Sequence, residues 1–570
     1  MKDLVNLFPR VRVAVAITVV ALVASGCATY QQTSTGHLNA FKAGNSAQAI
    51  AYYESNQDGK DKQLFMVEAG RLNLLDGDFL GSHRQFTKAI DQIFDVQEGS
   101  VIRLRDAGGT ALASTFFDDR TRSYNLPSFE AVFAFQQQAL NSIFLGDIQA
   151  ASVEMRRAVN AQDIIAEKYE QQIEKARQEA EEEKVAAGMP SVNDYYANMG
   201  PVLGRAKSGI QNPYVWYFSG LFYELQGDRA NAYIAYKKAW ELVPDNRFVQ
   251  RDLLRLGERE NPEEWRGFKE QFGLPIPEPA GNKADVIIVY EEGLISQRHS
   301  VGIPVFVING FQKVTFPVYQ DGPYQPARIQ ASWGGLDAGE LMPICYVQSL
   351  AYHDLRERIP GIAARNISRA ISRELVKAAG RQSDNSLVQI VTLIGAGVAS
   401  LADEADTRGW YSLPMGVQLL RSHLEPGEKT LRLSGYGMGR ELEIPMTLDP
   451  GETKLVWIAD KGTRVSFCVA SLTKGDRDPA QFSKIIGGGM AVATTTAIVP
   501  QSPHASPAPA VAGMARVAPP APAAPPPVIN HEVERPPAHG SAIGLMQPAP
   551  RNNKPREEKR EQKQAPITIF

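Results

Sequence analysis

Cysteine is scarce in this chain: 570 residues contain three, namely Cys27, Cys345 and Cys468. So few thiols exclude a disulfide-rich scaffold and offer no closely spaced set for a structural zinc site. Cys345 and Cys468 both lie in apolar, strand-like segments. In an oxidising compartment these two could form one disulfide, and two separately buried thiols are an equally good interpretation.

An excess of charge of one sign is also missing. The chain has 60 Lys and Arg against 63 Asp and Glu, a net charge of −3, so nucleic acid is not an expected partner. The motifs HExxH, GxSxG and GxxxxGK(S/T) do not occur, and no Cys–His set has the spacing of a metal site. Cys345 and His353 are the one Cys and His close together, and both fall in a predicted core region. We therefore expect no enzyme activity, no cofactor and no bound metal.

Hydrophobic runs of the roughly 20 residues needed to span a bilayer are absent as well. The longest are Val13–Ala24, Leu387–Ala402 and Ile485–Val499. We interpret the last two as buried core helix or strand. The alternative is that they line a membrane-facing surface or an oligomeric pore.

The first of these runs belongs to a predicted signal peptide, residues 1–26, because three basic residues precede it and small residues end it. The segment Leu22–Cys27 resembles the lipobox of bacterial lipoproteins. It implies that Cys27 becomes the lipidated N-terminus, followed by a linker over 27–37. Three acyl chains would anchor the protein durably. Because Ala28 stands where an inner-membrane retention signal has Asp, the resemblance implies the outer membrane, with the body in the periplasm.

Residues 213–246 have the pattern of a complete tetratricopeptide-type repeat, a helix–turn–helix unit of 34 residues. Its small, aromatic and turn positions are Trp216, Gly220, Tyr223, Gly227, Ala232, Tyr236, Ala239 and Pro244. Weaker copies occupy 38–54, 63–94 and 127–160. The pattern predicts tetratricopeptide-like helical repeats over 38–275, including a long charged helix near 161–186.

Repeats of this type bind other proteins along the concave face formed by the first helix of each hairpin. Residues three or four apart share a helix face, so four residues are expected on this groove. They are Tyr214, Tyr217, Leu221 and Glu224. Trp216, Tyr223 and Tyr236 are expected to pack inside instead. Exposed tyrosines often anchor interfaces, which makes Tyr214 and Tyr217 candidate partner-binding residues.

From residue 284 the pattern changes to short alternating strands separated by Gly- and Pro-containing turns, such as Asn309-Gly310. It predicts an antiparallel, sandwich-like β domain over 284–475 that folds independently, with helices inserted near 348–380 and 386–403. The fold class is therefore α+β. An apolar Gly-rich segment, 476–500, follows.

The last segment, 501–570, contains 15 of the 37 prolines and few large apolar residues, so we predict a disordered tail with a basic end. Earlier in the chain, Asp406, Arg408 and Trp410 form a compact polar and aromatic cluster. We interpret it as a corner between a helix and a strand, held by an Asp–Arg pair and a packed Trp. A ligand contact is the alternative.

Several motifs follow one another in a characteristic order: Ala139-Leu140, Gly146-Asp147, Val153-Glu154-Met155-Arg156-Arg157, Gln211-Asn212-Pro213-Tyr214, Val289-Tyr290-Glu291-Glu292-Gly293, Ala405-Asp406-Thr407-Arg408-Gly409-Trp410 and Leu413-Pro414. They resemble a little-characterised family of bacterial outer-membrane lipoproteins that have tetratricopeptide-like repeats and a β-rich C-terminal region. The resemblance covers roughly residues 38–470 and implies no particular activity. It does not extend to the Pro-rich tail.

Together these features predict an outer-membrane-anchored lipoprotein that acts as a protein–protein interaction scaffold or assembly factor in the bacterial cell envelope. Its partners would be other envelope proteins, bound through the repeat groove, and the membrane, bound through lipid. The alternative is a subunit of an envelope export or secretion complex whose apolar segments contact membrane or a channel. A cell-wall hydrolase is a weaker third hypothesis, because no nucleophile or metal constellation occurs.

Overall fold

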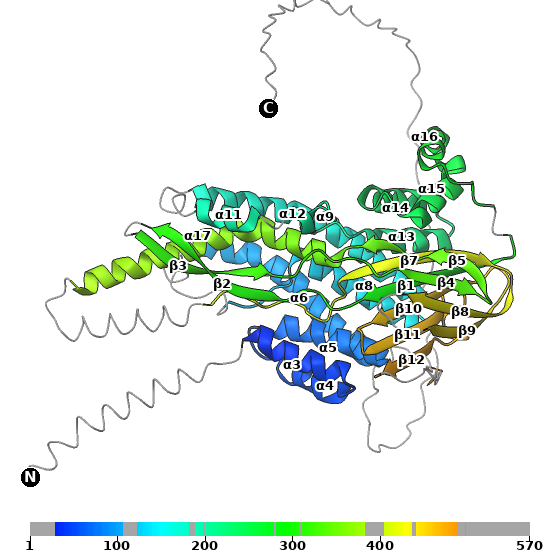
Figure 1. Cartoon of the computed structure of the whole chain (residues 1–570), viewed down its shortest axis with the longest axis horizontal. Helices are drawn as coiled ribbons and strands as arrows, with labels where there is room; N and C mark the ends of the chain where they lie inside the picture. The colour runs from blue at the N-terminus through cyan, green and yellow to red at the C-terminus, as the bar shows by residue number, and fades with distance from the viewer. Residues whose placement is uncertain are drawn as a thin grey trace, which may run out of the picture. The chain divides into compact units, whose positions relative to one another are not determined.

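The computed structural model describes residues 29–106, 122–181, 189–197, 200–278, 281–307, 310–381, 404–435, 441–487 and 496–497. These residues form an α+β fold in which helices come first and strands follow, as the sequence predicts (Figure 1). The predicted signal peptide, Cys27, the helix over 386–403 and the tail over 501–570 lie outside the described residues.

The helical half is built of antiparallel helix pairs in which successive helices pack on each other. The pairs are α3 (Tyr30–Lys42) with α4 (Ser46–Ser55), α5 (Lys62–Asp76) with α6 (Phe79–Asp106), α8 (Ser128–Phe144) with α9 (Ile148–Glu181), α13 (Pro213–Leu225) with α14 (Arg229–Leu242), and α15 (Arg247–Glu260) with α16 (Pro262–Phe272). The predicted long charged helix is the end of α9, as far as Glu181.

Glycine sets the turns of these hairpins. Gly44, Gly77, Gly146 and Gly227 each follow a first helix and have φ between 79° and 100°, the left-handed conformation that glycine adopts at least cost. Gly220 is needed for a different reason, because a Cβ there would lie 2.7 Å from the Tyr236 ring. These glycines therefore close the turns of the helix pairs and let α13 and α14 approach each other closely.

The largest sheet has seven strands in the order β13-β12-β11-β10-β1-β7-β6. They are β1 (Ala284–Glu292), β6 (Met342–Cys345), β7 (Gly416–Leu424), β10 (Thr453–Asp460), β11 (Arg464–Ser471), β12 (Gln481–Ile486) and β13 (Thr496–Ala497). The prediction of a purely antiparallel region is wrong, because β1 and β10 pair in parallel. The boundary at residue 476 is wrong too, since β12 belongs to this sheet.

Two smaller sheets complete the β region. The first has the order β5-β4-β8-β9, formed by β4 (Ile329–Trp333), β5 (Leu336–Glu340), β8 (Gly427–Gly435) and β9 (Leu442–Leu448). The second is a hairpin of β2 (Arg298–Val307) and β3 (Gly310–Tyr319), which packs on α11 (Met189–Ala197) and on α17 (Val347–Arg381). A short helix, α12 (Gly200–Leu203), also packs on α17. The helix expected near 348–380 is α17 itself.

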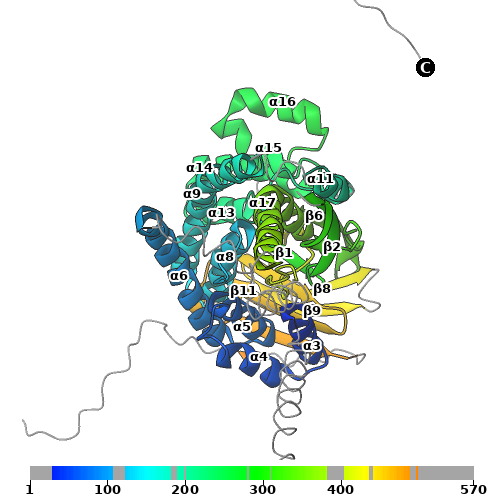
Figure 2. The ribbon, with the colours of Figure 1, turned by 90° about the vertical axis from the view of Figure 1, so that its left-hand side faces the viewer.

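Helices and sheet share one hydrophobic core, so the structure differs from the separable β domain expected over 284–475. Figures 1 and 2 show helices α8 and α13 lying along the seven-stranded sheet. The ring of Phe144 in α8 lies 5.5 Å from that of Trp457 in β10, and Phe79 lies 5.5 Å from Phe482 in β12. Strands β10 and β11 are buried along their whole length. A strand buried on both faces needs the helices to cover it.

Candidate functional site

The two described cysteines do not form the disulfide that the sequence allowed. Cys345 ends β6 and Cys468 lies in β11, and both are free and buried. Four strand steps separate them in the sheet order, or about 19 Å at the usual strand spacing, whereas a disulfide needs Cα atoms within about 7 Å. Burial raises the pKa of both thiols. They are structural core residues.

The expected partner-binding face on α13 is not exposed. Tyr214 and Tyr217 are completely buried, and Leu221 is 1% exposed. The expectation was wrong because spacing shows that residues share a face but not what covers it. Here the chain's own strands cover it: α13 contacts β6, and Glu224 reaches β7 through a salt bridge.

That salt bridge belongs to a network centred on Arg421 of β7. The Arg421 guanidinium donates to Asp285 of β1, to Asp252 of α15 at 2.9 Å and to Glu224 at 3.2 Å. Arg255 of α15 pairs with the same Asp252 and Glu224. Burial opposes the ionisation of Glu224, but the guanidinium groups of Arg421 and Arg255 outweigh it and hold the Glu224 pKa well below its usual range. The network therefore fixes α13 and α15 against the sheet.

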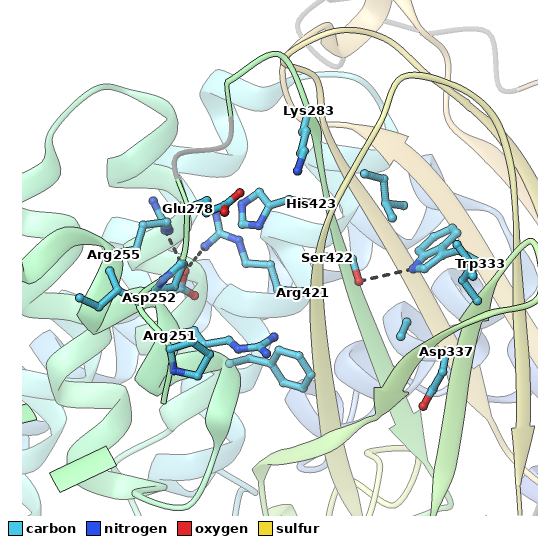
Figure 3. A pocket seen from close by; sticks show the side chains of 17 residues that line it. Arg251, Asp252, Arg255, Glu278, Lys283, Trp333, Asp337, Arg421, Ser422 and His423 are labelled. Atoms are coloured by element: carbon cyan, nitrogen blue, oxygen red, sulfur yellow. Dashed lines mark hydrogen bonds and ion pairs between the residues drawn. The ribbon is translucent and has the colours of Figure 1, made fainter. Parts of the chain in front are cut away.

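One side of this network opens into a cavity of about 500 Å³ between α15 and the four-stranded sheet that contains β4 and β5 (Figure 3). We call it the α15–β5 cavity. Its lining residues are Phe248, Arg251, Asp252, Arg255, Pro275, Ile276, Pro277, Glu278, Lys283, Trp333, Leu336, Asp337, Ala338, Arg421, Ser422, His423 and Leu424. Apolar and charged side chains are mixed there, which is typical of a binding site for a peptide more than for a purely apolar ligand.

The apolar part of the cavity is unusually accessible. Leu336, the first residue of β5, is 77% exposed, and Ile276 is 40% exposed. Trp333 also lines the cavity and is held in place, because its indole N–H lies 3.4 Å from the Ser422 hydroxyl. Figure 3 shows Trp333 and Arg421 on opposite sides of the cavity. A ligand could therefore contact an apolar wall and a charged wall at once.

The cluster of Asp406, Arg408 and Trp410 is a structural corner, as its residues indicate. Arg408 donates to both oxygens of Asp406, at 2.8 and 2.6 Å, and reaches Asp61 before α5 at 2.5 Å. Trp410 is 1% exposed. The corner leads into β7 and ties it to the first helices.

Two buried carboxylates that sequence reasoning missed hold this corner. Glu68 of α5 accepts the backbone N–H groups of Tyr411, at 2.6 Å, and Ser412, at 3.3 Å. Glu130 of α8 accepts the N–H of Trp410 at 3.1 Å and the Tyr124 hydroxyl at 2.8 Å. The available signal was an acidic residue among apolar neighbours, Glu68 in the middle of α5 and Glu130 in the first turn of α8.

These carboxylates predict a pH dependence. Burial raises the pKa of both Glu68 and Glu130 from 4.5 to about 7. The folded chain therefore binds more protons than the unfolded chain between these values. Each group therefore contributes on the order of 1–3 kcal/mol to the free energy of unfolding. This contribution is fully present below pH 4.5 and is lost as the pH rises through 7.

Glu130→Gln isolates one of these contributions. The amide oxygen can still accept from Trp410 N, and the amide nitrogen can donate to the Tyr124 hydroxyl, so the corner is preserved. The free energy of unfolding in urea should differ less between pH 5 and pH 8 for the variant than for the unchanged chain. An equal pH dependence of both proteins would contradict the raised pKa.

Within the described residues, no group of three or more His, Cys, Asp or Glu side chains is arranged to hold a metal ion. A scan against protein-family models finds no family that matches this chain, and a search of curated protein sequences finds no relative.

Proposed function

We propose that this chain is an outer-membrane-anchored lipoprotein that acts as an interaction scaffold or assembly factor in the bacterial cell envelope, without enzymatic activity or a cofactor. On this proposal the helix pairs form a tetratricopeptide-like solenoid, and the two larger sheets pack on each other as in a sandwich. The observation that carries it is the α15–β5 cavity, an accessible mixed surface lined by α15, by strands of two sheets and by the loop before β1. Since the chain's own sheet occupies the face of α13, partners dock at this cavity instead.

The occupant we propose is a short extended peptide of another envelope protein, with an apolar side chain beside an acidic one. Among the strands that the structure describes, β5 is at the edge of its sheet and pairs with β4 alone, so its outer backbone groups can pair with an added strand. Leu336 and Trp333 provide the apolar contact. Arg251 is exposed at the opposite wall, where it can meet a carboxylate.

This docking site is tested by placing a photo-crosslinking residue at position 336 in cells. A matched control position is Ile234 of α14, which is 51% exposed but outside the cavity. We expect a discrete adduct with one envelope protein from position 336 and not from 234. Adding Arg251→Glu should remove that adduct without changing the melting temperature. Identical adducts from both positions would exclude the cavity as the docking site.

The membrane anchor is tested separately. Among the described residues no helix is long and apolar enough to cross a membrane. On our proposal membrane attachment depends on acylation of Cys27. A palmitate analogue should label the unchanged chain in cells, and Cys27→Ala should abolish the label and release the protein from the membrane fraction. Equal labelling of both would contradict lipidation.

The export-complex alternative is favoured by one observation. Phe306 and Phe311, on the two strands of the β2–β3 hairpin, are 45% and 69% exposed, and their rings lie 5.5 Å apart in an edge-on contact. An exposed aromatic pair of this kind suits an apolar partner surface. Uniform rings in negative-stain images of the purified protein would support this alternative over a monomeric scaffold.

A further inference from the structure

The first described helix begins very close to the predicted lipid attachment site. Helix α3 starts at Tyr30 with Thr29 as its N-cap, inside the segment 27–37 that the sequence predicts to be a linker. Ala28 is therefore the one residue between Cys27 and the folded body. Two peptide units span at most about 7 Å in any conformation, so the Cα atoms of Cys27 and Thr29 cannot lie farther apart than this.

The start of α3 is fastened to the rest of the body and does not act as an extension of the linker. Thr29 and Gln32 form a capping box, in which each side chain accepts the backbone N–H of the other, at 3.3 and 3.2 Å. The side chains of Gln31 and Thr35 both donate to Oε1 of Gln297, at 2.9 and 2.8 Å. Gln297 directly precedes β2, so the first two turns of α3 are held against a distant part of the chain.

The outer side of α3 is polar and uncharged. One side of the helix is buried against the body, whereas Gln32, Gly36 and Asn39 are exposed along the other side. We call these three residues the anchor face. No Asp or Glu occurs from Ala28 to Tyr53, although the whole chain has 63. A bilayer with anionic lipids repels carboxylates, so a surface without them can approach the headgroups closely.

We propose that the anchor face rests on the lipid headgroups of the bilayer that holds the acyl chains of Cys27, an inference that depends on the lipidation proposed above. Buried acyl chains hold Cys27 at the boundary between hydrocarbon and headgroups, and the headgroup layer is roughly 5–8 Å thick. A tether of about 7 Å therefore keeps the first turn of α3 at the outer edge of this layer. A long flexible linker would instead let the body move away from the bilayer.

This contact also orients the α15–β5 cavity. Figures 1 and 2 show α3 and α4 on one side of the body and α15 and α16 on the opposite side. With the anchor face on the bilayer, α15 and the cavity that it lines face the aqueous space. The partner that docks in the cavity therefore approaches from the aqueous side, and the segment that it inserts is not embedded in lipid.

Fluorescence quenching in vesicles tests the contact. Cys345 and Cys468 are buried, so a cysteine introduced at the surface of the lipidated full chain can be labelled selectively with the fluorophore NBD. The test variant is Gln32→Cys, and the matched control is Gln271→Cys, which replaces an exposed glutamine of α16. Each protein is reconstituted in vesicles of phosphatidylethanolamine and phosphatidylglycerol, with and without a lipid that carries a nitroxide on its headgroup. If Gln32→Cys lowers the melting temperature, Gly36→Cys replaces it, because a Cβ at Gly36 meets open space.

We expect the label at position 32 to lose most of its emission in the presence of the nitroxide lipid, and the label at position 271 to lose almost none. Inserting about ten Gly and Ser residues after Ala28 should restore the emission at position 32, because the added tether of roughly 17 Å frees the body from the surface. Equal quenching at both positions, quenching at neither, or unchanged quenching after the insertion would overturn the contact in protein that floats with the vesicles. Protein that does not float would contradict the Cys27 anchor itself, and this inference would fail with it.

Discussion

Replacing Arg71 with Met should lower the free energy of unfolding by about 3–5 kcal/mol, the usual cost of removing one partner from a buried ion pair. Arg71 in α5 and Glu291 in β1 form a salt bridge in which both side chains are 0% exposed. Arg71 also donates to Gln137 at 2.6 Å and lies 5.7 Å from the Trp457 ring centre. Met would fill much of the space, but the Glu291 carboxylate would stay buried away from water without the cation that it pairs with.

Two further variants separate this explanation from a simple packing defect. In the double variant Arg71→Met, Glu291→Leu neither charge of this pair is left buried without the other, so most of the lost stability should return. Arg229→Met breaks an ion pair with Glu260 in which the Arg is 41% exposed, and should cost no more than about 1 kcal/mol. Urea unfolding followed by circular dichroism measures all three. If Arg71→Met lowers the free energy of unfolding no more than Arg229→Met does, the claim that the Arg71–Glu291 pair is buried is wrong.

Tyr217→Ala should also lower the free energy of unfolding by about 3–5 kcal/mol, because it truncates a fully buried aromatic side chain. The Tyr217 hydroxyl donates to Asp252 Oδ2 at 2.9 Å, and its ring centre lies 5.1 Å from that of Tyr236. The substitution therefore leaves a void between α13 and α14 and weakens the Arg421 network. Had this face been a free groove, the same change would leave stability nearly unaltered.

Tyr217→Phe and Tyr195→Ala are the controls for this prediction. Tyr217→Phe removes only the hydroxyl, so it should lower the free energy of unfolding by about 1 kcal/mol. Tyr195 of α11 is 42% exposed, and its truncation should change stability by less than about 1 kcal/mol. If Tyr217→Ala resembles Tyr195→Ala in its unfolding midpoint, the sheet does not cover this face.

Local features of the fold were predictable from the sequence because neighbouring residues determine them. Glycine at Gly44, Gly77, Gly146 and Gly227 marks turns through its backbone freedom alone, and the helical spacing of α17 needs no partner. The pairing of strands could not be predicted in this way. Strand β1 lies between β7 and β10, which begin more than 120 residues later, and short apolar strands contain no signal that selects one partner over another.

The candidate sites were less predictable than the fold for the same reason. Glu224, Asp252, Asp285 and Arg421 come from four elements, and only the folded chain brings them together. The available signal was a single Arg inside the apolar strand β7, which indicates a buried charge but not its partners. The helical spacing of α13 predicted that Tyr214, Tyr217 and Leu221 share one face, but every residue from Pro213 to Phe222 is buried. What covers that face is set by the sheet.

The central claim is that the helix pairs and the seven-stranded sheet form one cooperative unit, which closes the repeat face to partners. Native-state hydrogen exchange of the full chain, read by mass spectrometry, tests it most directly. In the Arg71→Met variant, amides of α5, α8 and α13 and amides of β1, β7 and β10 should lose the same free energy of protection. If the strands kept their protection while the helices lost theirs, the sheet would be an independent domain and the claim would be wrong.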